Sequence, residues 1–154
     1  MTIDYISRTK AYYRALGFER DYTWANNTET PLSKPRVTLK DATVTLITTA
    51  VVEPSIPKPV RTAASYAFSE VPEHFDTSEL AWDKVTTHTR DRESYFPINE
   101  LKARSAQGEF KALSQHFHFV PTEYSQRHTL EVDAPLILQQ SLKDNVDLAI
   151  LIPL

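Results

Sequence analysis

The stretch Asn145-Val146-Asp147-Leu148-Ala149-Ile150-Leu151-Ile152-Pro153-Leu154 decides the expected fold. It is a nearly continuous apolar run that follows a helix-like segment, and such a run is typical of a parallel strand covered on both faces. In an open α/β sheet, ligands bind just beyond the carboxyl ends of the parallel strands. The sequence therefore directs the search for a site to this end of the expected sheet.

Length and charge restrict the class of protein. The chain has 154 residues and a formal net charge of −3, which fits a single domain over residues 1–154. Both charge signs are interspersed without a basic stripe, so no nucleic-acid partner is expected. The apolar runs are shorter than the roughly 20 residues of a membrane span, and the N-terminus has no signal-peptide pattern. We therefore expect a cytoplasmic protein that has no membrane contact.

The residue types that are missing exclude several chemistries. These 154 residues contain no cysteine, which excludes disulfides, thiolate metal sites and cysteine nucleophiles within them. The two glycines, Gly17 and Gly108, cannot form a glycine-rich phosphate loop. The sequence also lacks the Gly-x-Ser-x-Gly elbow that a serine hydrolase of the α/β class would carry.

Hydrophobic periodicity predicts alternating helices and strands. The expected helices are residues 3–16, 97–107 and 129–144, and the expected strands are residues 42–50, 85–90, 113–120 and the final stretch. Residues 51–71 hold three prolines and are expected to form a long loop. Strands separated by helices indicate parallel pairing. We therefore expect a three-layer α/β domain with a mostly parallel open sheet and flanking helices, incomplete at its C-terminal edge.

Polar side chains mark two candidate places for a site. Thr48 and Thr49 lie at the carboxyl end of the strand predicted over residues 42–50. Their hydroxyls can bind a carboxylate or an oxyanion, or they can cap the next turn. Asp76, Thr77 and His88 gather a carboxylate, a hydroxyl and an imidazole. They can position a small polar substrate, although turn caps and solvated loops explain them too.

A histidine-based metal site is a further alternative. His116 and His118 lie two residues apart on an expected strand and therefore point to the same side, a spacing that zinc and iron sites use. The candidates for further ligands are His74, His88, His128, Asp76 and Glu123. Nothing in their spacing selects three ligands, and ordinary strand histidines explain the pair as well. We therefore expect no metal.

Four ordered stretches resemble one protein family. They are residues 44–50; residues 75–78 with 86–88; residues 96–101 ending at 108–110; and residues 145–153. Together they resemble the selenoprotein B family of glycine, sarcosine, betaine and D-proline reductases. The likeness spans nearly the whole chain. It is carried by the order of the four stretches, because no single motif among them is highly specific.

The resemblance implies a component of a selenol- or thiol-dependent reductase that cleaves a C–N bond of a small amino acid or amine. In the family, a selenocysteine or cysteine follows the last strand and attacks the carbon that bears the amine. The substrate of well-known members is held as an adduct on a pyruvoyl group of a partner subunit. The resemblance implies that Thr48, Thr49 and Thr77 bind substrate, and that Asp76 and His88 position it or move protons. It also implies a thiol or selenol electron donor.

The chain departs from this family in two respects. It stops at Leu154, where the nucleophile would be next. Selenocysteine is encoded by UGA, ordinarily a stop codon, so we expect a reading frame closed at that codon; a deliberately chosen boundary is the alternative. Ala50 and Val51 stand where many members have glycine after the paired threonines, which argues against a close backbone approach by substrate there.

Two further expectations follow from the missing nucleophile. Residues 1–154 alone are expected to lack reductase turnover, and an uncovered last strand is expected to favour homo-oligomers. The alternative function belongs to another class: a non-catalytic α/β domain that binds a small acid or a partner subunit in the same strand-end cleft.

Overall fold

The computed structural model describes residues 4–21, 23–31, 33–52, 62–78, 80, 83–122 and 124–154. Its internal contacts divide the chain into two compact units, Met1–Leu32 and Ser33–Leu154. The second unit contains the sheet and all the candidate site residues.

The first unit contains one described helix, α1 (Tyr5–Ala15). Its N-cap is Asp4, whose carboxylate accepts the backbone N–H of Ser7 at 3.0 Å and the Ser7 hydroxyl at 2.6 Å. Gly17 follows the helix with a φ of 89°, a left-handed conformation that glycine adopts without a steric penalty. The helix predicted over residues 3–16 is therefore confirmed over the part that is described.

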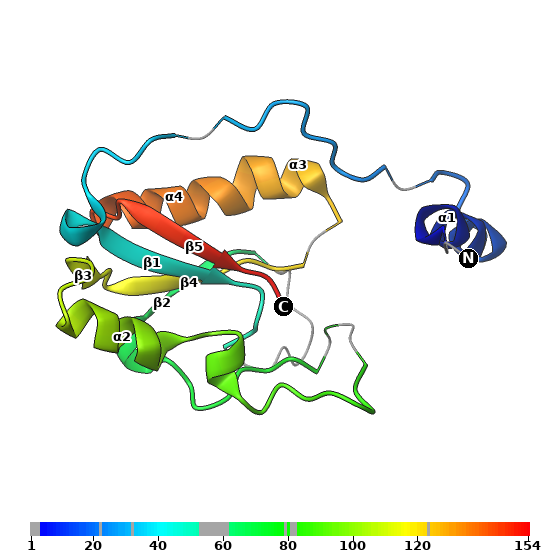
Figure 1. Cartoon of the computed structure of the whole chain (residues 1–154). Coiled ribbons are helices and arrows are strands. Elements are labelled where there is room, and N and C mark those ends of the chain that lie inside the picture. The colour runs from blue at the N-terminus through cyan, green and yellow to red at the C-terminus, as the bar shows by residue number, and fades with distance from the viewer. Residues whose placement is uncertain are drawn as a thin grey trace. The chain divides into compact units, whose positions relative to one another are not determined.

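The second unit contains a mixed, mostly parallel sheet. Its strands are β1 (Thr43–Thr48), β2 (Ala64–Ala67), β3 (Ala112–Leu113), β4 (His116–Phe119) and β5 (Leu148–Ile152). β1 is central and pairs in parallel with β3, β4 and β5, whereas β2 pairs antiparallel with β4 (Figure 1). The predicted parallel α/β sheet is thus confirmed, with one antiparallel strand that the sequence analysis did not expect.

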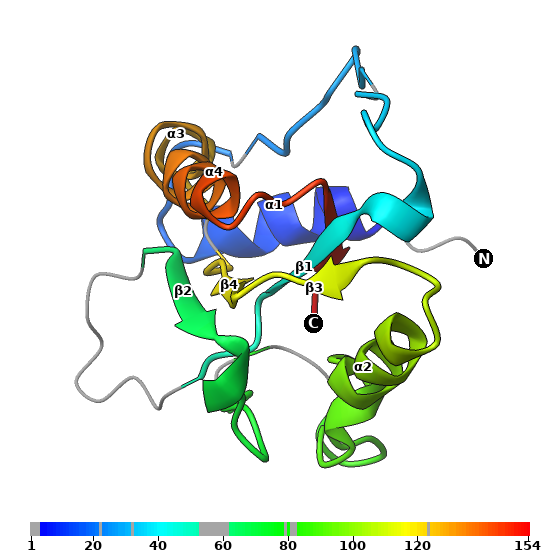
Figure 2. The same ribbon diagram turned by 90° about the vertical axis from the view of Figure 1, so that its left-hand side faces the viewer.

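Helices cover the two faces of this sheet. They are α2 (Ile98–Ala106) and a continuous helical segment formed by α3 (Gln126–His128), a π-helix (Thr129–Asp133) and α4 (Ala134–Lys143). Figure 2 shows α2 on one side of the sheet and α3 and α4 on the other. Short 3₁₀ turns at Leu39–Asp41, Phe68–Glu70 and Arg92–Ser94 complete the described elements. The predicted three-layer arrangement is confirmed.

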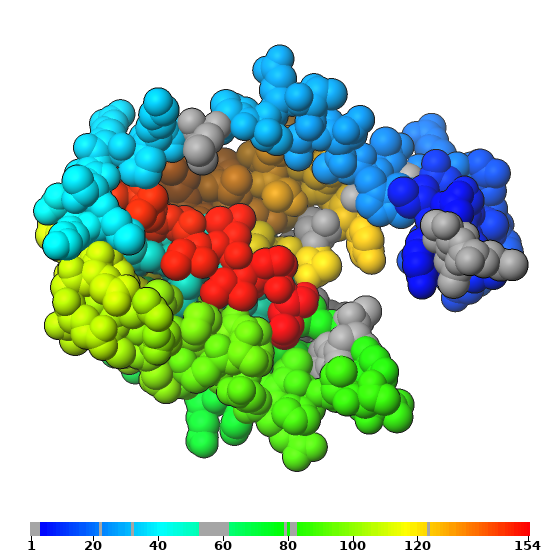
Figure 3. Space-filling view, in the orientation of Figure 1, coloured from blue at the N-terminus to red at the C-terminus, as the bar shows by residue number. Residues whose placement is uncertain are grey.

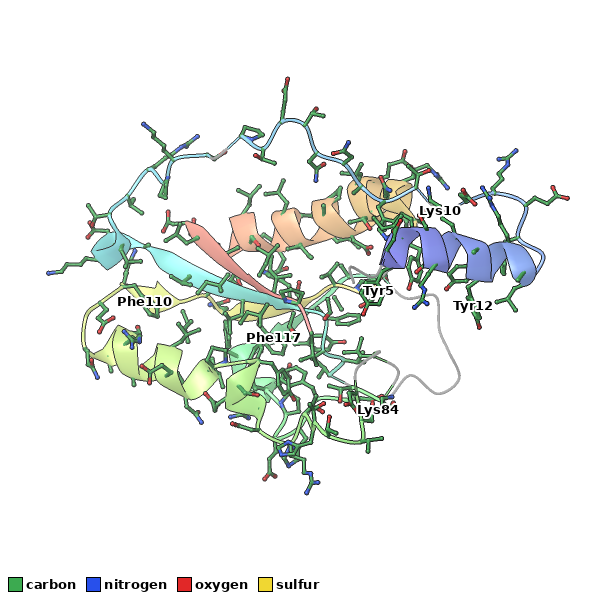
Figure 4. The ribbon with its side chains drawn as sticks, turned by 45° about the vertical axis from the view of Figure 1, so that its right-hand side comes forward. Tyr5, Lys10, Tyr12, Lys84, Phe110 and Phe117 are labelled. Carbon is green, nitrogen blue, oxygen red and sulfur yellow. The ribbon has the colours of Figure 1, made fainter. Side chains whose placement is uncertain are left out.

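An aromatic core lies between the sheet and α2. Phe117 of β4, labelled in Figure 4, is fully buried together with Phe96, Leu46 and Ile98. The ring of Phe96 lies 5.1 Å from that of Phe117 and 4.9 Å from that of Phe75, measured between centroids. Such tilted and edge-to-face pairs add roughly 0.5–1.5 kcal/mol each to the hydrophobic stabilisation of burial.

The opposite face of the sheet is polar. The Thr45 hydroxyl donates to the carbonyl of His116 at 2.8 Å. The His118 ring hydrogen bonds the hydroxyls of Ser65 and Ser141 at 2.8 and 3.1 Å. His118 is fully buried between β2 and α4, and both of its ring nitrogens have a hydrogen-bond partner. This satisfies the rule that a buried polar group needs a partner.

Two predictions of local structure were wrong. Part of the loop predicted over residues 51–71 is β2, a strand without apolar alternation that forms because its backbone pairs with β4. Residues 85–90 were predicted to be a strand but are not one. Their first residues form a turn in which the Asp83 carboxylate accepts the N–H groups of Val85 and Thr86 at 3.0 and 3.2 Å.

The burial predicted for the final strand was also wrong. β5 forms where it was expected, but Ala149, Ile150 and Leu151 are exposed, and β5 lies on the surface in Figure 3. β5 pairs with β1, whereas α4 packs on β2 and β4. One face of β5 therefore lacks the helical cover that its apolar sequence implied.

Candidate functional site at the carboxyl edge of the sheet

The carboxyl ends of three parallel strands meet at one edge of the sheet. Thr48, the last residue of β1, pairs in register with Phe119 of β4 and with Ile152 of β5. The segment that follows β1 returns to this edge through an antiparallel bridge between Val51 and Asp76. The Asp76 N–H donates to the Val51 carbonyl at 2.7 Å, and the Val51 N–H donates back at 3.2 Å. This bridge brings Asp76 and its neighbours close to the end of β1.

The two threonines at the end of β1 have different roles. Thr48 is 1% exposed, and its Oγ1 accepts the N–H of Ala50 at 3.1 Å, so its hydroxyl caps the turn. Thr49 is half-buried, and its Oγ1 accepts the N–H of Leu154 at 2.9 Å. The Thr49 hydroxyl also donates to the Leu154 carbonyl at 3.3 Å, a long hydrogen bond. Thr49 is therefore the threonine whose hydroxyl donates only a long hydrogen bond and is partly exposed, so that a ligand can reach it.

Asp76 and Thr77 are held in place by local hydrogen bonds. The Asp76 carboxylate accepts the N–H of Ser78 at 2.9 Å, which is an Asx turn. Thr77 is buried, and its Oγ1 lies 2.6 Å from the Oγ1 of Thr89. The pair of hydroxyls ties the segment around residue 89 to the same edge of the sheet.

His88 is brought to this edge only through its backbone neighbour, Thr89. The His88 side chain is exposed and forms no hydrogen bond or ion pair within the described residues. The structure therefore groups the segments that carry Thr48, Thr49, Asp76, Thr77 and His88, but it does not bring the His88 imidazole into contact with the other four side chains.

The strand histidines have structural partners on neighbouring elements. As predicted, His116 and His118 point to the same face of β4, toward α4. The His116 ring and backbone N–H bond one oxygen of Asp144 at 2.8 and 2.9 Å, and Gln140 donates to the other at 3.0 Å. No cluster of three or more histidine, aspartate or glutamate side chains that could hold a metal occurs in the part of the chain that is described.

Electrostatics reinforce this structural role. Burial lowers the pKa of His118, and the neighbouring His116 lowers it further, against the opposing effect of Asp144. Burial acts to raise the pKa of Asp144, but the hydrogen bonds from His116 and Gln140 outweigh it and hold this pKa below its ordinary value. His118 is thus kept neutral and Asp144 charged near neutral pH.

A second acid–imidazole pair was not predicted as such. Asp133 is fully buried, and its Oδ1 lies 3.7 Å from the Nε2 of His128. The sequence analysis considered His128 only as a metal ligand and did not consider Asp133. The one signal in the sequence is Pro135, because a proline two residues after an aspartate in a helical run distorts the helix there.

Comparisons with family models, with curated proteins and with solved structures gave no match. Every helix among the described residues is too short or too polar to cross a lipid bilayer.

Proposed function

We propose that this chain corresponds to the selenol- or thiol-carrying component of a cytoplasmic reductase that cleaves a C–N bond of a small amino acid or amine. The observation that carries the proposal is the bridge between Val51 and Asp76, which gathers hydroxyls and a carboxylate at the carboxyl edge of a parallel sheet. The ordered resemblance to the selenoprotein B reductases supplies the reaction class.

In this proposal, Thr49 binds the substrate carboxylate. Its hydroxyl now makes a 3.3 Å contact with an oxygen of Leu154, and a substrate carboxylate within normal hydrogen-bonding distance would form a shorter, stronger bond. Thr48 and Thr77 shape the edge from within, because their hydroxyls are buried and paired. Asp76 and His88 are assigned to positioning the substrate.

The proposed reaction needs a thiol or selenol from outside these residues, because they include no cysteine. In the resembled family, that redox residue follows the strand that corresponds to β5. The carboxyl end of β5 is held beside Thr49, so a group attached after this strand would enter the same edge. The proposal also includes a partner subunit with a pyruvoyl group that carries the substrate, and a thiol or selenol electron donor.

The test is an NMR titration of the isotope-labelled chain with glycine, sarcosine, betaine and D-proline. Binding at the proposed edge shifts the amide signals of Thr49, Ala50, Asp76 and Thr77. Thr49→Val removes the hydroxyl at nearly constant volume and should weaken binding at least tenfold, since a hydrogen bond to a charged group contributes about 1.5–3 kcal/mol. Thr38→Val is the matched control, because Thr38 precedes the 3₁₀ turn Leu39–Asp41 at the other end of β1. Shifts confined to residues away from this edge would contradict the proposal.

The second candidate function is a non-catalytic domain that binds a small acid or a partner subunit. The exposed apolar residues of β5 favour a partner. The two functions differ in one measurement: when partner subunit and dithiol are supplied, a chain that carries a cysteine after Leu154 should release free amine from a bound substrate only if it is the reductase component, whereas residues 1–154 alone should release none. Amine release that is independent of this chain would favour the non-catalytic function.

A further inference from the structure

A π-turn makes His128 and Asp133 neighbours. In a regular α-helix, residues five apart lie about 140° apart around the axis, on different faces. Here Thr129–Asp133 is a π-helix, and the N–H of Ala134 bonds the carbonyl of Thr129, five residues earlier. Pro135 explains the wider turn, because it has no N–H to donate and its ring crowds the carbonyl four residues before it. π-turns within α-helices occur frequently at functional sites.

Asp133 has an unpaired oxygen in a buried position. Its side chain is fully buried, and its Oδ1 accepts the N–H of Ala63 at 2.7 Å. Among the described residues, its Oδ2 has no hydrogen-bond partner, and neither has the buried Nε2 of His128. Leaving a buried polar group unpaired destabilises the folded state, and a charged group does so more strongly. A site that retains this cost calls for an explanation beyond stability.

The orientation of the imidazole resembles that of a general base. Nε2 faces the interior, 3.7 Å from Asp133 Oδ1, while the side chain as a whole is 26% exposed. Nδ1 is neither among the buried unpaired atoms nor hydrogen bonded to a described residue. A buried carboxylate beside one ring nitrogen favours the tautomer that leaves a lone pair on the other. Hydrogen bonds of catalytic groups are often long in the absence of a ligand and shorten when one binds, which is compatible with the 3.7 Å between Nε2 and Oδ1.

The pair also lies at the candidate site's edge of the sheet. Asp133 binds the backbone just before β2, whose first residue, Ala64, pairs with Phe119 at the carboxyl end of β4. Figure 1 shows α3, which ends at His128, at the end of the helical segment nearest the strand arrowheads. The described charged groups beside this pair on its own helix are Arg127 and Glu131, which form an exposed ion pair with each other.

We propose that His128 and Asp133 form a proton-transfer pair that acts on a primary or secondary amine bound at the carboxyl edge. The neutral Nδ1 accepts one proton from the ligand's ammonium group, which leaves a free amine and an imidazolium that Asp133 stabilises. The reverse step returns the proton. A free amine is the form that reacts with a carbonyl group. The choice of an amine as ligand rests on the proposed function, whereas the geometry of the pair does not.

The first arm of the test reads the imidazole directly in the whole chain. Nitrogen NMR of labelled histidine should find neutral His128 protonated on Nε2. Asp133→Asn preserves the acceptor for the Ala63 N–H but removes the charge, and it should abolish this tautomer preference. An unchanged amide spectrum elsewhere shows that the variant is folded. The proposed pairing would be contradicted if neutral His128 carried its proton on Nδ1. It would also be contradicted if Asp133→Asn left the tautomer of His128 unchanged.

The second arm adds ligands. Sarcosine, whose ammonium group can donate a proton toward Nδ1, should shift the Nδ1 signal of His128 in the direction of its protonated form. Betaine is the matched ligand control, because its quaternary nitrogen carries no proton to transfer. His74→Gln, at an exposed histidine, is the control variant and should not alter the response. Sarcosine binding at the edge without this shift of the Nδ1 signal contradicts the His128–Asp133 pair. Failure of every ligand to bind contradicts the proposed function instead, and the tautomer measurement then decides whether the pair exists.

Discussion

His118 shows how one buried side chain connects three elements. It lies on β4, and its two ring nitrogens hold a hydroxyl on β2 and another on α4. A truncation such as His118→Ala would leave a buried cavity and remove the hydrogen bonds to Ser65 and Ser141. We expect it to lower the free energy of unfolding by roughly 2–4 kcal/mol, measured by urea denaturation, because the cavity cost and the loss of the two hydrogen bonds add. His74→Ala, at an exposed site, should change it by less than about 0.5 kcal/mol.

The same residue predicts a pH dependence. The pKa of His118 in the folded state is below its ordinary value of 6.5, because burial disfavours the charged ring. As the pH falls through 6.5, the unfolded chain takes up a proton that the folded chain does not. The free energy of unfolding should therefore keep its full value above this pH and decrease as the pH falls below it. His118→Gln should flatten this slope in urea titrations on either side of pH 6.5; an unchanged slope would contradict the assignment.

Asp144 should respond in a lower pH range. Its pKa in the folded protein is held below the ordinary value of 3.8 by the hydrogen bonds of His116 and Gln140. Its stabilising contribution is present above 3.8 and is lost as the pH falls through the folded value. Asp144→Asn should cost about 1–3 kcal/mol near neutral pH and show a smaller further loss in acid. Acid unfolding of both proteins is followed by far-UV circular dichroism. If variant and parent lose stability equally in acid, the role assigned to Asp144 is contradicted.

Residue types in the sequence indicated the edge of the sheet but not the pairing at it. Thr48 and Thr49 were predicted together, yet one caps a turn and the other faces the end of β5. Adjacent strand residues point to opposite faces, and only the turn decides which hydroxyl is used locally. The pair of His128 and Asp133 could not be predicted, because a spacing of five residues suggests no contact on a regular helix.

Among the elements, the turn from α4 to β5 depends on one residue. Asn145 has a φ of 54°, the left-handed conformation, and the N–H of Val146 bonds the Ser141 carbonyl at 2.9 Å. This is the helix-ending arrangement in which glycine is preferred. Asn145→Gly should be neutral or stabilising by about 0.5 kcal/mol, whereas Asn145→Val should cost about 1–2 kcal/mol. Thermal unfolding of both variants checks the order, and a more stable valine variant would contradict it.

Elements whose own sequence has a strong apolar periodicity were predicted correctly. An element that forms only through pairing with a neighbouring strand was not. β1 and α2 carry apolar residues at the period of their secondary structure and appear within two residues of the predicted ends. β2 is Ala64-Ser65-Tyr66-Ala67, a segment too short to show an apolar alternation, and β4 supplies its hydrogen bonds and the Phe117 ring on which Tyr66 stacks. Pairing of this kind is a tertiary effect that a local pattern does not contain.

For the whole molecule, the main liability is exposed apolar surface on α4 and β5. The exposed large side chains of these two elements are Leu136, Leu138, Leu142, Ile150 and Leu151. β5 also contains neither a charge nor a proline, the usual protections of a strand that pairs on one side.

We therefore expect self-association that depends on protein concentration. Leu151→Lys places a charge on a side chain that is 69% exposed and should reduce the associated fraction in sedimentation velocity runs. Val85→Lys is the matched control, because Val85 is 94% exposed but lies in a turn away from these elements. Equal effects of the two substitutions would show that general charge, not this surface, controls association.

The central position of β1 also has a consequence for how fast the protein folds. Its backbone is bonded to a residue 104 positions later, Asp147, and its partners β3, β4 and β5 all follow it at long range. Each such pairing loses the conformational entropy of a large loop before its hydrogen bonds form. Chains with such distant pairings fold in milliseconds to seconds rather than microseconds. During that interval β1 lacks its strand partners, so misfolding can occur while the strands assemble.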